Sequence, residues 1–154
     1  MTLTIGDKIP ALLGKDQSGN LIESKSFEGK KLALYFYPKD NTPGCTAQAC
    51  SLRDGYEELL KKGFSVVGVS VDDEASHQKF IDKHNLPFPL IADTDKELVT
   101  QFGVWQEKKS FGRTYMGTVR TTFIIDEEGV IVNIITGRKV NTKNHALQLL
   151  ELEI

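Results

Sequence analysis

Two apolar runs, separated by a segment with a strong helix-start signal, constrain the fold of this chain more than any other feature. The runs lie at residues 30–37 and 64–71, are rich in β-branched and aromatic residues, and are bounded by turn residues, as buried strands are. Between them Thr42 can be an N-cap, Pro43 occupies the first helical position and Gly63 is a stop signal. A strand, a helix and a strand in this order predict a parallel crossover.

The rest of the chain continues this alternation of helix and strand. We expect a helix, a short strand, another helix, a β-hairpin and a closing amphipathic helix with Ala146, Leu149, Leu150 and Ile154 at helical spacing. Their ranges are 74–85, 89–93, 96–102, 121–126 paired with 130–136, and 142–154. This order predicts an α/β fold with a mixed central sheet and helices on both faces.

Length and composition are those of an ordinary globular chain. The 154 residues fit a single domain, 1–154, with no internal repeat or linker to divide it. With 26% charged residues and a net charge of -2, we expect neither nucleic acid nor a membrane surface as partner. The apolar runs are far shorter than the roughly 20 residues of a membrane helix. Because the N-terminus also lacks the pattern of a signal or transit peptide, we expect a cytoplasmic protein.

Both cysteines of the chain, Cys45 and Cys50, lie just behind the Thr-Pro-Gly turn at the start of the predicted helix. In a reducing cytoplasm a lone pair is seldom a structural disulfide, so the alternatives are redox chemistry, metal ligation and two inert buried thiols. A metal site is disfavoured, because the three histidines, His77, His84 and His145, are scattered over predicted helices without ligand spacing.

Cys45 is expected in the first helical turn, at position N3. The helical spacing places it on the apolar face together with Ala49 and Leu52. The positive end of the helix dipole, unpaired backbone N–H groups and any nearby arginine all favour the thiolate, which is the nucleophilic form of cysteine. The pattern therefore favours Cys45 as a nucleophile.

Cys50 follows five residues later, too far along the helix for a disulfide. In an unbroken helix the two Cα atoms lie about 8–9 Å apart, whereas a disulfide spans at most about 7 Å. The pair is therefore expected to alternate between a helical dithiol and a locally unwound disulfide.

The segment "YFYPKDNTPGCTAQACSLRDGY" resembles the active-site segment of the peroxiredoxins, whose P-x-x-x-T-x-x-C pattern falls on Pro38, Thr42 and Cys45. A second cysteine five residues later is similar to the bacterioferritin comigratory protein subgroup, also called peroxiredoxin Q. Further segments, among them "VVGVSVDD", "FPLIADTDKELVTQFGVW" and "VRTTFIIDEEGVI", extend the resemblance over nearly the whole chain. The resemblance implies a thioredoxin-like fold and reduction of peroxides by a cysteine thiolate, with no cofactor.

The resemblance also implies roles for single residues. Cys45 would attack the peroxide and become a sulfenic acid, with which Cys50 would condense to an intramolecular disulfide. The family's active-site arginine falls on Arg120; it would bind the peroxide together with Thr42, while Pro38 shields the pocket from water. For the Thr42 hydroxyl, capping the Cys45 N–H is the alternative. The implied partners are hydrogen peroxide, organic hydroperoxides and thioredoxin or a similar dithiol reductant.

Some positions depart from the family pattern or invite another interpretation. Gln48 stands where many relatives carry glutamate, and Leu12 and Leu52 replace phenylalanines. Trp105 and Tyr115 are expected to pack over the edge of the core, with docking of a reducing partner as the alternative.

Two other functions compete with peroxide reduction. A thiol–disulfide oxidoreductase generally uses C-x-x-C, which the observed spacing does not match. A non-catalytic thioredoxin-like binding module would carry vestigial thiols. Because no C-terminal cysteine can bridge subunits, we expect a monomer, with a non-covalent dimer as the alternative.

Overall fold

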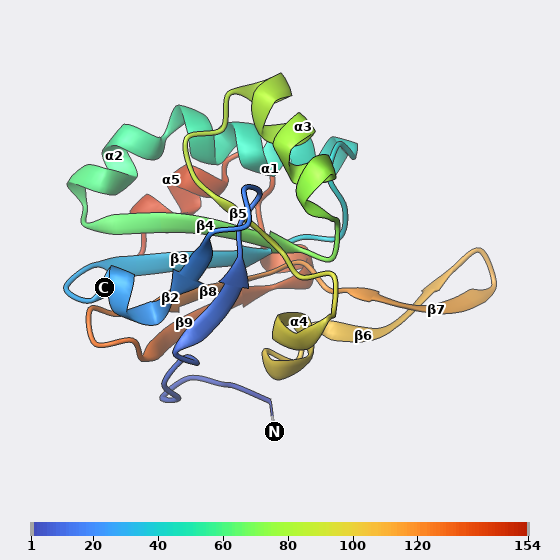
Figure 1. The fold of residues 1–154 in the computed structure, drawn as a ribbon, viewed down its shortest axis with the longest axis horizontal. Coiled ribbons are helices and arrows are strands. Elements are labelled where there is room, and N and C mark those ends of the chain that lie inside the picture. The colour runs from blue at the N-terminus through green and yellow to red at the C-terminus, as the bar shows by residue number, and fades with distance from the viewer. Residues whose placement is uncertain (1, 154) are drawn as a thin grey trace.

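A five-stranded mixed sheet forms the centre of the computed structural model, which describes residues 2–153 (Figure 1). Its strand order is β5-β4-β3-β8-β9. The bounds are β3 Lys31–Phe36, β4 Phe64–Ser70, β5 Leu90–Ala92, β8 Thr121–Ile125 and β9 Ile131–Thr136. Strand β3 pairs in parallel with β4, and β4 with β5, whereas β8 is antiparallel to β3 and to β9. The parallel crossover and the mixed sheet predicted from the sequence are confirmed.

Helices cover both faces of this sheet, as predicted (Figure 1). One face carries α1 Pro43–Asp54, α2 Tyr56–Lys61, α3 Glu74–His84 and α5 His145–Leu150. The other carries α4 Glu97–Gln101 and the hairpin of β1 Leu12–Lys15 and β2 Leu21–Glu23. Short 3-10 turns lie at Ser24–Phe27 and Gly137–Lys139. Among the described residues, the helices are too short or too polar for any of them to cross a bilayer.

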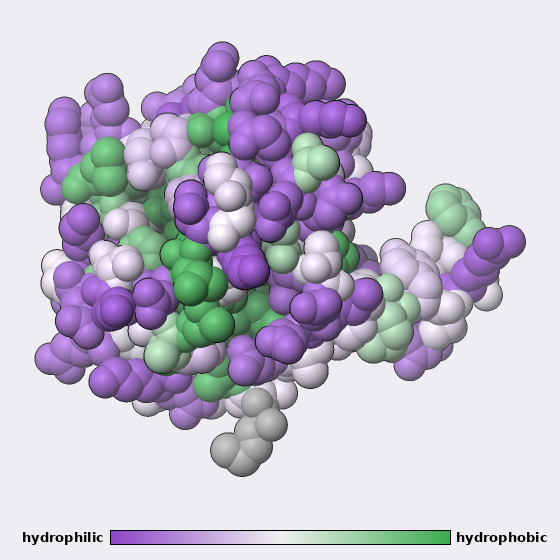
Figure 2. Space-filling model, viewed as in Figure 1, coloured by the Kyte–Doolittle hydropathy of each residue, from purple (hydrophilic) through white to green (hydrophobic). Residues whose placement is uncertain are grey.

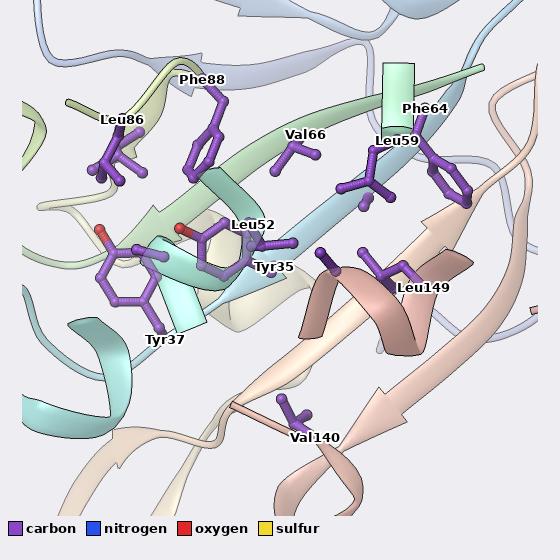
Figure 3. Packing of buried hydrophobic residues seen from close by; sticks show 14 of the residues in the cluster. Tyr35, Tyr37, Leu52, Leu59, Phe64, Val66, Leu86, Phe88, Val140 and Leu149 are labelled. Atoms are coloured by element: carbon purple, nitrogen blue, oxygen red, sulfur yellow. The ribbon is translucent and has the colours of Figure 1, made fainter. Parts of the chain in front are cut away.

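Strand β3 divides the core into two clusters because successive side chains of a strand point to opposite faces. Tyr35 and Tyr37 join the cluster beneath α1, α3 and α5, whereas Leu34 and Phe36 join the cluster against α4. Figure 3 shows the first cluster, to which α1 contributes Leu52. The helix with both cysteines is thus fixed to the sheet through its apolar face.

The single helix expected after Thr42 is in fact two, because α1 ends at Asp54 and α2 begins at Tyr56. Gly55 lies at the break, and glycine is a poor helix former. The helix α5 passes close to this point, because a Cβ atom on Gly55 would lie 2.5 Å from the Cβ of Ala146.

The closing helix is shorter than its predicted range of 142–154, since α5 spans only His145–Leu150. The residues before it form a turn in which the Asn141 side chain accepts a hydrogen bond from the backbone N–H of Asn144. Ala146 and Leu149 are buried as predicted, and Ile154 lies outside the described residues.

A hairpin of β6 Trp105–Ser110 and β7 Arg113–Thr118 lies between α4 and β8, where the sequence predicts no strand, and projects from the body of the molecule (Figure 1). Trp105 packs against the core, as expected. Tyr115 does not: its side chain is 48% exposed, because β7 extends away from the sheet. In Figure 2 the hairpin carries hydrophilic and hydrophobic residues in mixture, while apolar residues gather over β1 and β2, where Leu12 and Leu21 are exposed.

Candidate active site

The start of α1 positions Cys45. Thr42 is the N-cap and Pro43 the first helical residue, so Cys45 occupies N3, as predicted. Its side chain is 2% exposed and belongs to the core cluster that also holds Ala49 and Leu52. A thiol is thereby held at the positive end of the helix dipole and away from bulk water.

Arg120, directly before β8, reaches across to this thiol. Its Nη2 donates to the Cys45 Sγ at 3.2 Å, and its Nη1 donates to the Oε1 of Gln48 at 2.6 Å. Gly44 makes room for the guanidinium, since a Cβ there would lie 3.2 Å from the Arg120 Nη2. The arginine singled out by the family resemblance thus contacts the cysteine at the helix start.

Gln48 holds the arginine with a neutral acceptor. Its side chain is fully buried, and its Nε2 has no hydrogen-bond partner among residues 2–153. An amide carries no charge, so Gln48 leaves the positive charge of Arg120 uncompensated. That charge is therefore available to a thiolate or to a bound oxygen.

The Thr42 hydroxyl does not form the capping bond to the Cys45 N–H that was the alternative to peroxide binding. It donates to the backbone oxygen of Lys39 at 2.9 Å, and no side-chain cap bond is made to the first turn. The hydroxyl oxygen keeps its lone pairs as acceptors, and the N–H groups of the first turn are left to other partners. Pro38 lies half-buried in the same loop, between β3 and α1.

Asp40, a residue that sequence reasoning missed, anchors this loop from within. The buried carboxylate accepts from the Tyr37 hydroxyl at 2.5 Å and from the Ser76 hydroxyl at 2.8 Å. It also lies 2.7 Å from the Nδ1 of His77, and its backbone N–H donates to Asp72 at 2.8 Å. The loop that carries the P-x-x-x-T-x-x-C pattern is therefore tied to α3 and to the end of β4.

His77 completes the anchor. Its Nε2 lies 2.8 Å from the backbone oxygen of Ile91, and because a carbonyl only accepts, Nε2 carries a proton. Its Nδ1 faces the Asp40 carboxylate. Ligand-type atoms of Asp40, Asp72 and His77 come within 4.8 Å of one another, but the facing atoms are already hydrogen-bonded, so the cluster is complete without a metal ion.

Cys50 lies on the same unbroken helix as Cys45 but has a different surrounding. Both cysteines are free thiols, which is the helical dithiol arrangement expected for the pair. The Cys50 side chain is half-buried, and its Sγ lies 3.8 Å from the Nδ1 of His84 at the end of α3. The two thiols therefore face different neighbours, Arg120 and His84.

The pKa values of ionisable groups around the site are shifted because the site is buried. Burial raises the pKa of Tyr35 well above its ordinary value, and the nearby Cys45 and Asp40 raise it further, so this phenol stays neutral. Burial also lowers the pKa of Lys108 on the projecting hairpin, and the charge of Arg120 lowers it further, while Cys45 opposes this shift. Strand β6 therefore contributes a second cation to the electrostatic surroundings of Cys45.

Comparison with known proteins agrees with this geometry. The model of the AhpC/TSA family matches residues 5–134. Peroxiredoxin Bcp of Bacillus subtilis is 44% identical over 151 residues, covering 98% of this chain and 95% of the relative. Peroxiredoxin Bcp of Escherichia coli K12 is 43% identical over 143 residues, covering 93% and 90%.

Solved structures of peroxiredoxin Q are similar along the whole chain. A cysteine-to-serine variant of Xylella fastidiosa PrxQ has a TM-score of 0.87 at 30% identity, covering 97% of this chain and 94% of the other. The bacterioferritin comigratory protein of Xanthomonas campestris, described in a study of its alkyl peroxide reduction, has a TM-score of 0.82 at 33% identity, with coverage of 94% and 95%. The chain therefore belongs to the AhpC/TSA family and is a peroxiredoxin of the Bcp, or peroxiredoxin Q, type, a thiol-dependent peroxidase with a thioredoxin-like fold.

Proposed function

We propose that Cys45 is the residue that attacks the peroxide and that Cys50 resolves the product as an intramolecular disulfide. The observation that carries this assignment is the hydrogen bond from the Arg120 Nη2 to the Cys45 Sγ, made at the N-terminal turn of a helix. An arginine and a helix N-terminus together favour a thiolate. Cys50 has no such arginine bond in the described part of the chain and lies five residues along the same helix.

In the oxidation step the Cys45 thiolate attacks one peroxide oxygen and the O–O bond breaks. The product is a Cys45 sulfenic acid, and the leaving oxygen takes a proton to depart as water or an alcohol. Negative charge develops on that oxygen, so donors already aimed at the site lower the barrier. The Arg120 guanidinium and the N–H groups of the first turn supply them.

Thr42 and Pro38 would shape the place that the peroxide occupies. Because the Thr42 hydroxyl already donates to Lys39, its oxygen is free to accept a hydrogen bond from the O–H of the peroxide. Pro38 has no N–H to compete for the substrate, and its ring shields the thiolate from water. Water exclusion strengthens each of the charged interactions in the site.

In the second step the Cys50 thiol attacks the sulfenic sulfur, a disulfide forms and water leaves. The helical separation of the two residues exceeds what a disulfide spans, so the start of α1 must unwind. Unwinding would also bring a buried sulfur to the surface, where a dithiol reductant of the thioredoxin type can attack it. We propose such a reductant for this chain.

The substrates that we propose are hydrogen peroxide and organic hydroperoxides. The reduction of alkyl peroxides named for the Xanthomonas campestris protein supports the second class. We further propose one catalytic domain over residues 1–154, acting as a monomer in the cytoplasm, with no nucleic acid or membrane among its partners.

A single-turnover experiment tests the assignment of the two cysteines. Reduced protein is mixed with equimolar hydrogen peroxide and quenched, and the oxidation state of each cysteine is read by mass spectrometry. Cys45→Ser should consume no peroxide. Cys50→Ser should react once, accumulate sulfenic acid and pass to sulfinic acid with excess peroxide. Turnover by Cys45→Ser, or normal cycling of Cys50→Ser with a thioredoxin system, would disprove the corresponding role.

A further inference from the structure

Cys50 faces a histidine that the mechanism above does not use. The Cys50 Sγ lies 3.8 Å from the Nδ1 of His84, the last residue of α3. Arg53, one turn after Cys50 on α1, donates from its Nη1 to the backbone oxygen of His84 at 2.8 Å. The sulfur and the imidazole are therefore held together by the docking of α1 against the end of α3.

The His84 ring is held in place by packing, and one of its two nitrogen atoms faces Cys50. The ring packs edge-on against Phe80, with centroids 5.3 Å apart and planes at 79°. Its Nε2 is buried and has no hydrogen-bond partner among residues 2–153, whereas Nδ1 faces the sulfur. Burial lowers the pKa of His84, and the charges of Lys83 and Arg53 lower it further, so at neutral pH the ring is an uncharged imidazole with a lone pair.

We propose that His84 accepts the proton of the Cys50 thiol while α1 is still helical, so that Cys50 attacks the Cys45 sulfenic acid as a thiolate when the start of α1 unwinds. The proposal rests on the resolving role proposed above for Cys50. In this step the S–H bond of Cys50 breaks and its proton passes to the Nδ1 of His84. The S–S bond forms, the S–O bond of the sulfenic acid breaks, and the departing hydroxide takes a proton from solvent to leave as water, while the His84 imidazolium returns its proton to solvent. One thiol and one sulfenic acid give one disulfide and one water, so no outside oxidant or reductant is needed.

The two cysteines need different partners because they act at different times. Cys45 must be a thiolate before peroxide arrives, and a permanent cation such as Arg120 favours that form. Cys50 is needed only after the sulfenic acid has formed, and a neutral imidazole can take its proton at that moment.

The contribution of His84 to the rate of disulfide formation has an upper limit. A free thiol of ordinary acidity is about 3% thiolate at pH 7. A base that supplies the thiolate for the attack can therefore speed the reaction by at most about 30-fold at this pH. The advantage should shrink towards unity at about pH 9, where the thiolate forms without help.

The test compares disulfide formation in wild type and in His84→Phe, which keeps an aromatic ring against Phe80 but cannot accept a proton. A second variant, His84→Gln, keeps a polar group at the position. Asp82→Asn is the control, because Asp82 is an exposed neighbour in the last turn of α3 and bonds only Gln78 among the described contacts. The groups that face the ring, Cys50 and Arg53 on α1 and Lys83 on α3, are unchanged in each variant.

Reduced protein is mixed with equimolar hydrogen peroxide, quenched with acid over a time course and alkylated, and mass spectrometry separates sulfenic acid from disulfide. We expect all variants to lose the Cys45 thiol at the wild-type rate. In both His84 variants the disulfide should form about 10-fold or more slowly at pH 7 and within about 3-fold of wild type at pH 9.

Two results would overturn the role of His84. One is a wild-type rate of disulfide formation at pH 7; the other is an equal loss at pH 7 and pH 9, which would show that the ring only supports the packing of α1 on α3. If wild type itself forms no disulfide, the resolving role of Cys50 fails as well, so the two failures are distinguishable.

Discussion

Arg120 is the residue on which the proposed chemistry most depends, because one guanidinium contacts both the Cys45 sulfur and a buried amide. Its two hydrogen bonds, to Cys45 and to Gln48, arrange the planar group so that one nitrogen faces the sulfur. A lysine offers a point charge on a flexible chain and cannot reproduce this fork. A positive charge at position 120 is therefore not sufficient without the planar two-nitrogen geometry of arginine.

Arg120→Ala should slow the oxidation of Cys45 by roughly 10²-fold, as the loss of other donors to a developing oxyanion does. Arg120→Lys should recover only part of that loss. The second-order rate constant with hydrogen peroxide, followed by the loss of the Cys45 thiol in quenched samples, measures both effects. Arg113→Ala is the matched control, since this arginine lies exposed on β7. An unchanged rate in Arg120→Ala would show that the arginine is only structural.

The residues of the site differ in how far the sequence could predict them. Cys45 follows from helix-start signals and helical spacing, which are local. Arg120 lies 75 positions away from it and could be chosen over other arginines only through the family resemblance. The contact of Cys50 with His84, and the anchoring of the loop by Asp40 and His77, had no local signal because each joins α1 or its loop to α3.

At the scale of elements, the loop before α1 and the first turns of α1 are held in different ways. Asp40 in the loop is tied to α3 through Ser76 and His77, by bonds that do not involve either cysteine. The first turns of α1, in contrast, are held by helical hydrogen bonds and by the burial of Cys45 and Ala49. A disulfide between Cys45 and Cys50 would break the contacts that hold the first turns of α1. The bonds that tie the Asp40 loop to α3 would stay intact.

Oxidation should therefore loosen residues 45–51 while the loop and α3 keep their protection. Amide hydrogen exchange with mass spectrometry, on reduced and on peroxide-treated protein, measures this difference. We expect faster exchange in the early part of α1 and unchanged exchange in Glu74–His84. Cys50→Ser treated in the same way is the control, because it cannot form the disulfide. Full protection of α1 in the oxidised protein would show that the disulfide forms without unwinding.

Elements with a buried, periodic pattern could be predicted, and those defined by contacts could not. The runs that became β3 and β4 are apolar along their length, so their strand character is local. The hairpin of β6 and β7 is mostly polar, and its turn places Phe111 at a positive φ of 51° instead of using the Asn-Gly pair that signals a hairpin. Its strands consequently carried no recognisable pattern.

For the whole molecule, the closing helix α5 joins α1, the helix with both cysteines, to the sheet. The backbone N–H of Ala146 donates to the Ser51 hydroxyl of α1, and the Nε2 of His145 lies 2.9 Å from the Thr122 hydroxyl of β8. The fold class was predictable because the strand and helix order determines the sheet. The position of α5 against α1 and the sheet was not predictable, since it depends on buried polar contacts between distant segments.

His145 makes the stability of the molecule depend on pH. The ring is buried; its Nδ1 donates to the Oε1 of Gln148, so the Nε2 of a neutral ring accepts from Thr122. Burial lowers the pKa of His145 from its ordinary 6.5 to about 4, with a further lowering by Arg120. Because the pKa is lower in the folded state, the unfolded chain binds the proton first as the pH falls. The stabilisation is therefore complete above about pH 6.5 and is lost progressively between about pH 6.5 and pH 4.

The expected loss over this range is about 3 kcal/mol, from a shift of about 2.5 pH units. Urea unfolding at a series of pH values gives the free energy of unfolding for wild type and for His145→Gln. The variant should be less stable than wild type at pH 7, because it loses a buried hydrogen-bonded ring, but its stability should fall less steeply towards pH 4. Lys143→Gln, an exposed neighbour, should follow the wild-type curve. Parallel curves for wild type and His145→Gln would mean that His145 takes up its proton as readily in the folded protein as in the unfolded chain.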